Sequence, residues 1–235
     1  MVLVPDPTRT VFISTPTTSR QNVIPIRLAQ KLAMTCNSRS IFSDLYFDSG
    51  HNRQSKHIAR VDRPFHRRLY RNISPEFIRK EIQNRNIIVV DDVITTGGSV
   101  ASFCKELSNN GYAVKSVVAL MGDARLNIDP KTQERLHDAL KKAATSLDSA
   151  SISSRLTRSE AGGLIMLINA ARSENAKQKL TTNLQRLLDQ EPFRDLGRDQ
   201  TTGRNKGIGR ADLCDGGVFE RIPAWTVRKG GGLER

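Results

Sequence analysis

The stretch Ile-Ile-Val-Val-Asp-Asp-Val-Ile-Thr-Thr-Gly-Gly-Ser-Val, residues 87–100, indicates how this chain folds. Its first four residues form an apolar run typical of a central parallel strand, and a helical stripe begins at Val100. Between the two lie adjacent acids and a turn rich in glycine and hydroxyl groups. The segment predicts a buried strand, a turn and a helix, with two carboxylates at the carboxyl end of the strand.

Further strands are expected on both sides of this stretch. Residues 10–14 and 117–121 are short apolar runs, and Ile41, Leu45 and Phe47 are expected on one face of another strand. Helices of about a dozen residues fit between these strands. The alternation indicates an α/β fold with an open parallel sheet flanked by helices.

The helices between the strands carry start and stop signals. Asn22 is expected to cap a helix whose apolar stripe is Ile24, Leu28 and Leu32, and Ser74 to cap a short helix before Pro75. A third helix has an apolar stripe and a terminating Asn-Gly pair, at Val100, Phe103, Cys104, Leu107, Asn110 and Gly111. Residues 50–72 show no clean period and are expected to form a loop or an irregular hairpin.

After Gly122 the pattern predicts helices alone. Thr157 and Glu160 form a capping box before an apolar run, and leucines recur at helical spacing on both sides of it. We therefore expect three parts: an α/β domain over residues 1–128, a helical extension over 129–192, and a glycine-rich, flexible tail over 193–235.

Charge favours a partner that carries phosphate. The 235 residues include 37 Lys and Arg against 24 Asp and Glu, a formal net charge of +13. Residues 51–86 contain ten basic and three acidic side chains, whereas residues 87–130 contain three basic and five acidic ones. The basic excess is therefore concentrated beside an acidic strand and turn.

Cysteine usage and hydropathy bear on the compartment. The three cysteines, Cys36, Cys104 and Cys214, are odd in number and far apart, which favours a reducing environment. No apolar run approaches the roughly 18 to 20 residues that a membrane span requires. We expect a soluble, cytoplasmic protein without a membrane partner.

The turn after residue 94 has the chemistry of a phosphate cradle. Glycines allow close approach of the backbone, and the N–H groups of the turn and of the helix N-terminus favour an anion. Asp91 and Asp92 suit sugar hydroxyls, or a divalent cation reached through water. A ribose phosphate would satisfy both halves of the site.

Residues 87–99 resemble the phosphoribosyl-pyrophosphate-binding signature of the type I phosphoribosyltransferases. The signature has four apolar residues, two acids, two apolar residues and a Thr-Gly turn, and the match is unbroken. The resemblance implies that Asp91 and Asp92 hold the ribose 2′- and 3′-hydroxyls. It implies that the 5′-phosphate is held by Thr95, Thr96, Gly97, Gly98 and Ser99. An ordinary strand, turn and helix with incidental acids is the alternative.

Two other strand ends fit this family more loosely. Thr18, Ser19 and Arg20 follow the first strand, where the family has its pyrophosphate-binding loop, although a Ser/Thr-rich connection needs no function. Residues 122–125, Gly-Asp-Ala-Arg, are similar to a motif near the base pocket of relatives. A polar strand exit explains that motif equally well.

The basic stretch over residues 53–71 corresponds to an interval in which the family has a mobile loop. That loop closes over the reaction centre, and its cations stabilise the charge of the departing diphosphate. Lys56 and Arg60 are our candidates for this role, and a solvated basic surface is the alternative.

The resemblance implies a Mg²⁺-dependent phosphoribosyltransferase that transfers phosphoribose to a nitrogenous base and releases pyrophosphate. Lys56, Arg60 and Asp92 would be the catalytic residues, and Mg²⁺ would bind through the substrate, with Asp91 and Asp92 acting through water. Thr95 stands where 6-oxopurine members carry an acid, so orotate-type and competence-associated (ComF-like) members fit better. Because the first strand begins near residue 10, residues 51–86 or the later helices would supply the hood over the base.

A regulator is the rival expectation. A phosphoribosyltransferase fold could sense nucleotides or bind nucleic acid through its positive charge. A basic face continuous with the helical extension would favour the regulator, whereas basic residues around the cradle would favour the enzyme. A homodimer remains open under either reading.

Overall fold

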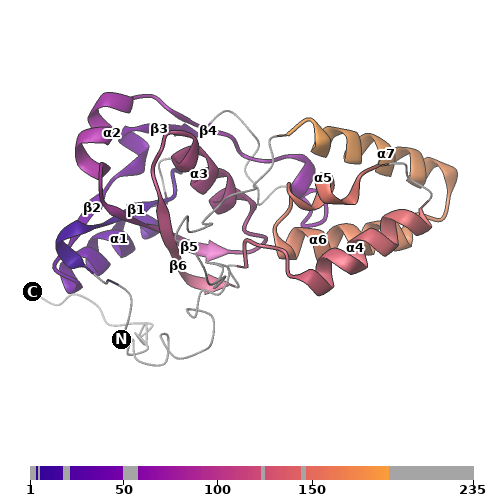
Figure 1. Cartoon of the computed structure of the whole chain (residues 1–235), viewed down its shortest axis with the longest axis horizontal. Helices are drawn as coiled ribbons and strands as arrows, with labels where there is room; N and C mark the ends of the chain where they lie inside the picture. Colours follow the sequence, from indigo (N-terminus) through magenta and orange to yellow (C-terminus); the bar gives the residue numbers. More distant parts are fainter. Residues whose placement is uncertain are drawn as a thin grey trace, which may run out of the picture.

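The computed structural model describes residues 4, 6–17, 22–49, 58–122, 125–143 and 147–190. Figure 1 shows a sheet with its helices on one side of the molecule and a separate group of helices on the other. Four parallel strands form the main sheet in the order β2, β1, β5, β6. Their bounds are Arg39–Ile41 (β2), Thr10–Ser14 (β1), Asn86–Ile94 (β5) and Val114–Gly122 (β6). The α/β class and the parallel sheet predicted from the sequence are confirmed.

The two central strands end side by side. Ser14, the last residue of β1, pairs with Val90 of β5, and the amide of Thr15 donates a 2.8 Å hydrogen bond to the carbonyl of Val90. Strand β5 then continues past its partner into Asp91 and Asp92. The register therefore brings the loop after β1 next to the aspartate pair.

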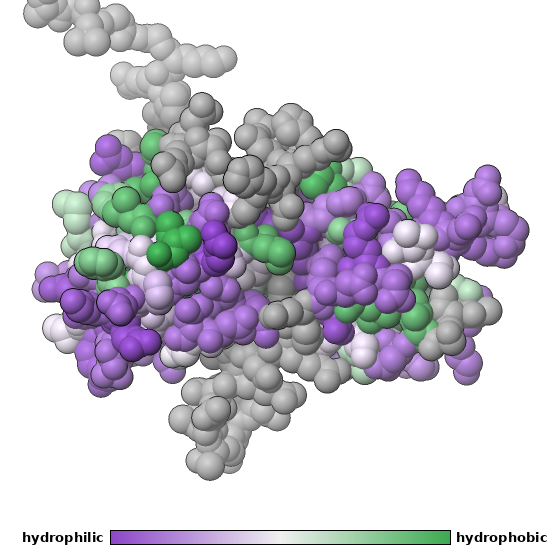
Figure 2. Space-filling view, turned by 90° about the horizontal axis from the view of Figure 1, so that it is seen from above, coloured by the Kyte–Doolittle hydropathy of each residue, from purple (hydrophilic) through white to green (hydrophobic). Residues whose placement is uncertain are grey.

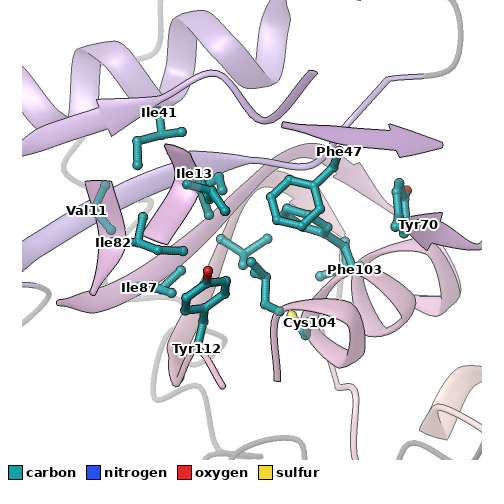
Figure 3. Packing of buried hydrophobic residues seen from close by; sticks show 14 of the residues in the cluster. Val11, Ile13, Ile41, Phe47, Tyr70, Ile82, Ile87, Phe103, Cys104 and Tyr112 are labelled. Atoms are coloured by element: carbon teal, nitrogen blue, oxygen red, sulfur yellow. The ribbon is translucent and has the colours of Figure 1, made fainter. Parts of the chain in front are cut away.

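Helices cover both faces of the sheet. Helix α1 (Ile24–Thr35) packs Ala29 and Ala33 against Phe12, Ile88 and Val90 on one face. Helices α2 (Pro75–Ile82) and α3 (Gly98–Asn109) lie over the other face, where alternate strand residues meet Phe103 and its neighbours (Figure 3). The period of two along β1 and β5 thus places a core on each side of the sheet.

The start of α1 differs by one residue from the expectation. Val23 is the N-cap, and Pro25, Ala29 and Ala33 form the buried stripe. Ile24 is 49% exposed. Asn22 lies one position before the N-cap, and its Oδ1 accepts a 3.2 Å hydrogen bond from the amide of Ile24.

The prediction that Ile41, Leu45 and Phe47 share one strand is wrong. Strand β2 ends at Ile41, a 3-10 turn (η2, Ser43–Leu45) follows, and β3 (Phe47–Ser49) pairs antiparallel with β4 (Tyr70–Asn72) in a second sheet. Leu45 is 64% exposed. The chain bends at η2 because Asp44 accepts hydrogen bonds from the amide and hydroxyl of Thr17, at 2.7 and 2.9 Å.

Residues 125–190, called here the helical unit, have a hydrophobic cluster of their own. Their helices are α4 (Pro130–Lys142), α5 (Ser149–Ser153), α6 (Arg158–Ala170) and α7 (Glu174–Leu188). The predicted capping box of Thr157 and Glu160 is present at the start of α6. Phe65, in the 3-10 turn η4 (Arg63–Phe65), packs into this cluster although it precedes the central strand in sequence.

Hydrophilic residues cover most of the face shown in Figure 2, and hydrophobic residues appear there in separate groups. Among the helices of the described residues, none is long and apolar enough to cross a membrane. The expected tail over residues 193–235 lies outside the described residues.

Candidate functional site

A pocket of about 340 Å³ lies where the carboxyl ends of the central strands face the helical unit. Thr15, Thr17 and Asn22 line it from the loop after β1, and residues 91–100 line it from β5 and the start of α3. Glu160 of α6 closes it from the helical unit. The structure therefore brings all seven residues expected at the ribose and phosphate positions, Asp91, Asp92 and residues 95–99, into one cavity.

The aspartate pair is held by its own backbone and by Asn22. The amide of Asp92 donates to Oδ1 of Asp91 at 3.0 Å, and the amide of Val93 donates to Oδ1 of Asp92 at 2.8 Å. The Asn22 side-chain amide donates to Oδ2 of Asp92 at 2.7 Å. Both carboxylates are thus oriented before any ligand binds.

Burial raises the pKa of Asp91 to about 7, and the neighbouring Asp92 carboxylate also raises it. The amide of Asp92 and the nearby Arg68 guanidinium act in the opposite direction. Near neutral pH, Asp91 can therefore be either an acceptor or a donor of a hydrogen bond.

The turn over residues 95–99 leads directly into the N-terminus of α3, where backbone N–H groups are available to an anion. Gly97 has φ +81°, a left-handed conformation that favours glycine, and α3 begins at Gly98. Thr96, Gly97 and Gly98 are buried, whereas Thr95 is exposed. The turn and the first helical amides border the pocket, where they can donate hydrogen bonds to an anion.

Basic side chains form another part of the pocket wall. They come from the segment around η4, and they are Arg63, His66, Arg67 and Arg68. Arg63 Nη1 donates a 2.6 Å hydrogen bond to Oγ1 of Thr95. These cations belong to the basic stretch recognised in the sequence, but their spacing gave no sign of which ones face the site.

Of the two cations chosen from the sequence, the structure describes Arg60 alone. Arg60 is exposed and is not among the residues that line the pocket. Lys56 lies outside the described residues, as do Thr18, Ser19 and Arg20 of the expected pyrophosphate loop. Asp123 and Ala124 of the motif after β6 also lie outside them.

Glu160 is a site residue that the sequence did not indicate as one. Its Oε2 accepts a 2.9 Å hydrogen bond from Nη2 of Arg67, and the two side chains are 1% and 3% exposed, respectively. The hydroxyl of Thr157 also donates to the carbonyl of Thr96. A capping box predicts where a helix starts, but nothing local tells which distant turn that start will contact.

The protein offers a divalent cation at this site a pair of carboxylates and no larger set of ligands among the described residues. Among the described residues, no group of three or more His, Cys, Asp or Glu side chains is arranged to hold a metal ion. Asp91 and Asp92 alone could contact a cation that brings most of its ligands from water and a bound phosphate. The site thus combines paired carboxylates, an anion-binding turn and several cations.

Comparison of the chain with protein-family models, with curated proteins and with solved structures found no match.

Proposed function

We propose that this protein is a phosphoribosyltransferase that uses 5-phosphoribosyl 1-pyrophosphate and Mg²⁺ to transfer phosphoribose to a nitrogenous base, with release of pyrophosphate. The observation that carries the proposal is the convergence of three kinds of group on one 340 Å³ pocket: paired aspartates, a glycine turn at a helix start, and three arginines. A sugar that bears phosphate at both ends requires this combination, whereas a simple phosphate or a simple sugar does not.

Each part of that substrate has a counterpart in the pocket. Asp91 and Asp92 suit the 2′- and 3′-hydroxyls, because carboxylates accept hydrogen bonds from vicinal hydroxyls. The turn over residues 95–99 suits the 5′-phosphate. Arg63 and Arg68 border the same cavity and suit the diphosphate.

Mg²⁺ fits the residues present as a cation carried by the substrate. Its preference for oxygen ligands and retained waters agrees with two adjacent carboxylates, of which Asp91 is partly buried. When bound, the ion would neutralise charge on the diphosphate.

In this reaction the protein would contribute mainly by positioning the substrates and by compensating the charge of the leaving group. The nitrogen lone pair of the base attacks C1, the bond from C1 to the diphosphate oxygen breaks, and pyrophosphate leaves with that electron pair. Arg63, fixed by its hydrogen bond to Thr95, would stabilise the charge that develops on the leaving group. The aspartate pair would hold the ribose so that C1 faces the nucleophile.

The arrangement of cations favours the enzyme over a regulator that binds nucleic acid. Arg63, Arg67 and Arg68 line the same pocket as the turn, and Glu160 adds an acid from the helical unit. Long polyanions need an open basic track, whereas these three arginines line a pocket. The acceptor would be a small base, with residues 63–68 and Glu160 forming the cover over the site.

Calorimetry tests the proposal directly. Wild-type protein is titrated with phosphoribosyl pyrophosphate and Mg²⁺ and compared with Asp91→Asn and Asp92→Asn, with the exposed Asp138→Asn on α4 as the matched control. We expect binding by wild type and the control, at least tenfold weaker binding by the two site variants, and pyrophosphate release with a suitable base. Absence of binding by wild type would refute the proposal. Binding without pyrophosphate release across a panel of bases would favour the regulator.

A further inference from the structure

The start of α6 is built against the phosphate turn itself. The hydroxyl of Thr157 donates to the carbonyl of Thr96, and its methyl group lies 3.5 Å from the position that a Cβ on Gly97 would occupy. On the same side, a Cβ on Gly98 would come nearer than 3.0 Å to Oε1 of Glu160. Thr157 and Glu160 of the α6 start therefore lie close to the positions that Cβ atoms on Gly97 and Gly98 would occupy.

A buried carboxylate in this place would ordinarily oppose anion binding. Glu160 borders the pocket, and its Oε1 is buried without a hydrogen-bond partner among the described residues. A ligand phosphate at the same helix start would meet a second negative charge at close range, where the low local dielectric strengthens repulsion.

Arg67 offsets that charge. Its guanidinium donates to Oε2 of Glu160 at 2.9 Å and to the carbonyl of Arg155, so it spans from the pocket wall into the helical unit. The pair is almost fully buried. Removal of one partner from such a pair leaves an uncompensated charge, whereas removal of both often costs little.

We propose that the start of α6 is a positioning element of the phosphate site: Thr157 and Glu160 hold the turn over residues 95–98 in its binding conformation, and Arg67 cancels the charge that Glu160 would otherwise present to the ligand. Ligand binding at the turn and docking of the helical unit are then coupled in both directions. The identity of the ligand rests on the function proposed above, whereas the bracing of the turn by α6 does not.

Charge cancellation by Arg67 predicts an order of affinities that a general loss of folding would not produce. Ribose 5-phosphate is the probe, because its phosphate tests the turn without the diphosphate, and each variant is first checked by thermal unfolding. Arg67→Met leaves the Glu160 side chain without its ion-pair partner and should bind the probe at least tenfold more weakly than wild type. Arg67→Met combined with Glu160→Gln removes the carboxyl group of Glu160 and should recover most of the loss. A double variant no better than Arg67→Met would overturn the charge role of Arg67.

Amide hydrogen exchange at residues 96–100 of the free protein tests whether Thr157 holds the turn. Thr157→Val removes the hydroxyl at nearly constant shape, and Thr157→Ser keeps it. Glu174→Gln, which removes an exposed ion pair on α7, is the control. We expect at least tenfold faster exchange of the turn amides in Thr157→Val and rates close to wild type in the other two variants.

The two failures can be told apart. If wild type binds neither phosphoribosyl pyrophosphate nor ribose 5-phosphate, the proposed function fails, and the exchange experiment still decides whether α6 braces the turn. Equal turn exchange in Thr157→Val and Thr157→Ser overturns the inference, whatever the protein binds.

Discussion

The side-chain amide of Asn22 donates a 2.7 Å hydrogen bond to Oδ2 of Asp92, across 70 residues of sequence. Asn22 also accepts a 3.2 Å hydrogen bond from the amide of Ile24, at the first turn of α1. One side chain thus ties the start of a helix on one face of the sheet to the aspartate pair at the strand ends. The orientation of Asp92 depends on where α1 begins.

Replacement of Asn22 by alanine should weaken sugar-phosphate binding while leaving the fold intact. The loss of a hydrogen bond to a partly exposed carboxylate is expected to cost about 1 kcal/mol, or roughly fivefold in affinity. Asn22→Asp should bind still more weakly, because it places a third negative charge beside the pair. Calorimetry with phosphoribosyl pyrophosphate and Mg²⁺ measures both effects, and equal affinities for wild type and Asn22→Ala would show that Asp92 needs no such support.

Ligand binding should depend on pH through Asp91. Its pKa of about 7 leaves the carboxyl largely protonated at pH 6 and ionised at pH 8, and the ionised form is the better acceptor for ribose hydroxyls and the better partner for Mg²⁺. Affinity should therefore rise from pH 6 to pH 8, by up to about tenfold per pH unit below the pKa. In Asp91→Asn only the ligand's own phosphates still titrate at the site, so the affinity should rise less steeply with pH than in wild type.

The same shift has the opposite effect on stability. The folded state keeps a proton on Asp91 up to about pH 7, whereas the ordinary carboxyl has a pKa of 3.8. Between these values the folded protein binds more protons than the unfolded chain, so the contribution of Asp91 to stability falls as pH rises from about 4 to 7. Denaturant unfolding of wild type and Asp91→Asn across this window measures the effect, and the stability of wild type relative to Asp91→Asn should fall as pH rises.

Gly98→Ala should destabilise the protein because its new methyl group meets Glu160. We expect a loss of about 1–3 kcal/mol in the free energy of unfolding, typical of an overpacked site. Gly162→Ala, in the middle of α6 where a Cβ would find nothing within 4 Å, is the matched control. It should raise stability by about 0.5–1 kcal/mol through helix propensity. A neutral Gly98→Ala would show that Glu160 can move away from the turn at little cost.

Arg63 and Arg60 provide a direct comparison of two nearby cations. Arg63→Ala removes the group hydrogen-bonded to Thr95 and should lower kcat/KM by about 100-fold if that cation stabilises the departing diphosphate. Arg60→Ala removes an exposed charge outside the pocket lining and should have a much smaller effect. A larger loss for Arg60→Ala would restore the assignment made from the sequence.

The sheet and the cradle could be predicted because their signals are local. The apolar run over residues 87–90, the two acids and the glycine turn are consecutive, so periodicity alone orders them into strand, turn and helix. For residues 41–47, the same use of periodicity predicted a single strand, which is wrong. Its bend at η2 depends on hydrogen bonds from Thr17 to Asp44, and no period within the segment shows them.

The part of the pocket wall that holds Arg67 and Glu160 could not be predicted for a related reason. Arg67 and Glu160 are 93 residues apart, and each is unremarkable in its own neighbourhood: one arginine in a basic run, one acid in a capping box. Their meeting depends on how the helical unit docks, which is decided by Phe65 and the cluster that it joins. Pairing of distant charges leaves no trace in composition or spacing.

The late arrival of Glu160 has a consequence during protein synthesis. The four strands and the turn are complete in a nascent chain of 122 residues, whereas Gln190, which donates to the carbonyl of Pro64, is among the last described residues to leave the ribosome. At about 5–20 residues per second, the 38 residues from Gly122 to Glu160 take roughly 2 to 8 seconds, and the 68 residues to Gln190 take roughly 3 to 14 seconds. Until Glu160 has been made, Arg67 lacks this carboxylate, and until the helical unit has docked, the turn lacks its contact with Thr157. The charge balance around the glycine turn therefore differs between the nascent chain and the finished protein.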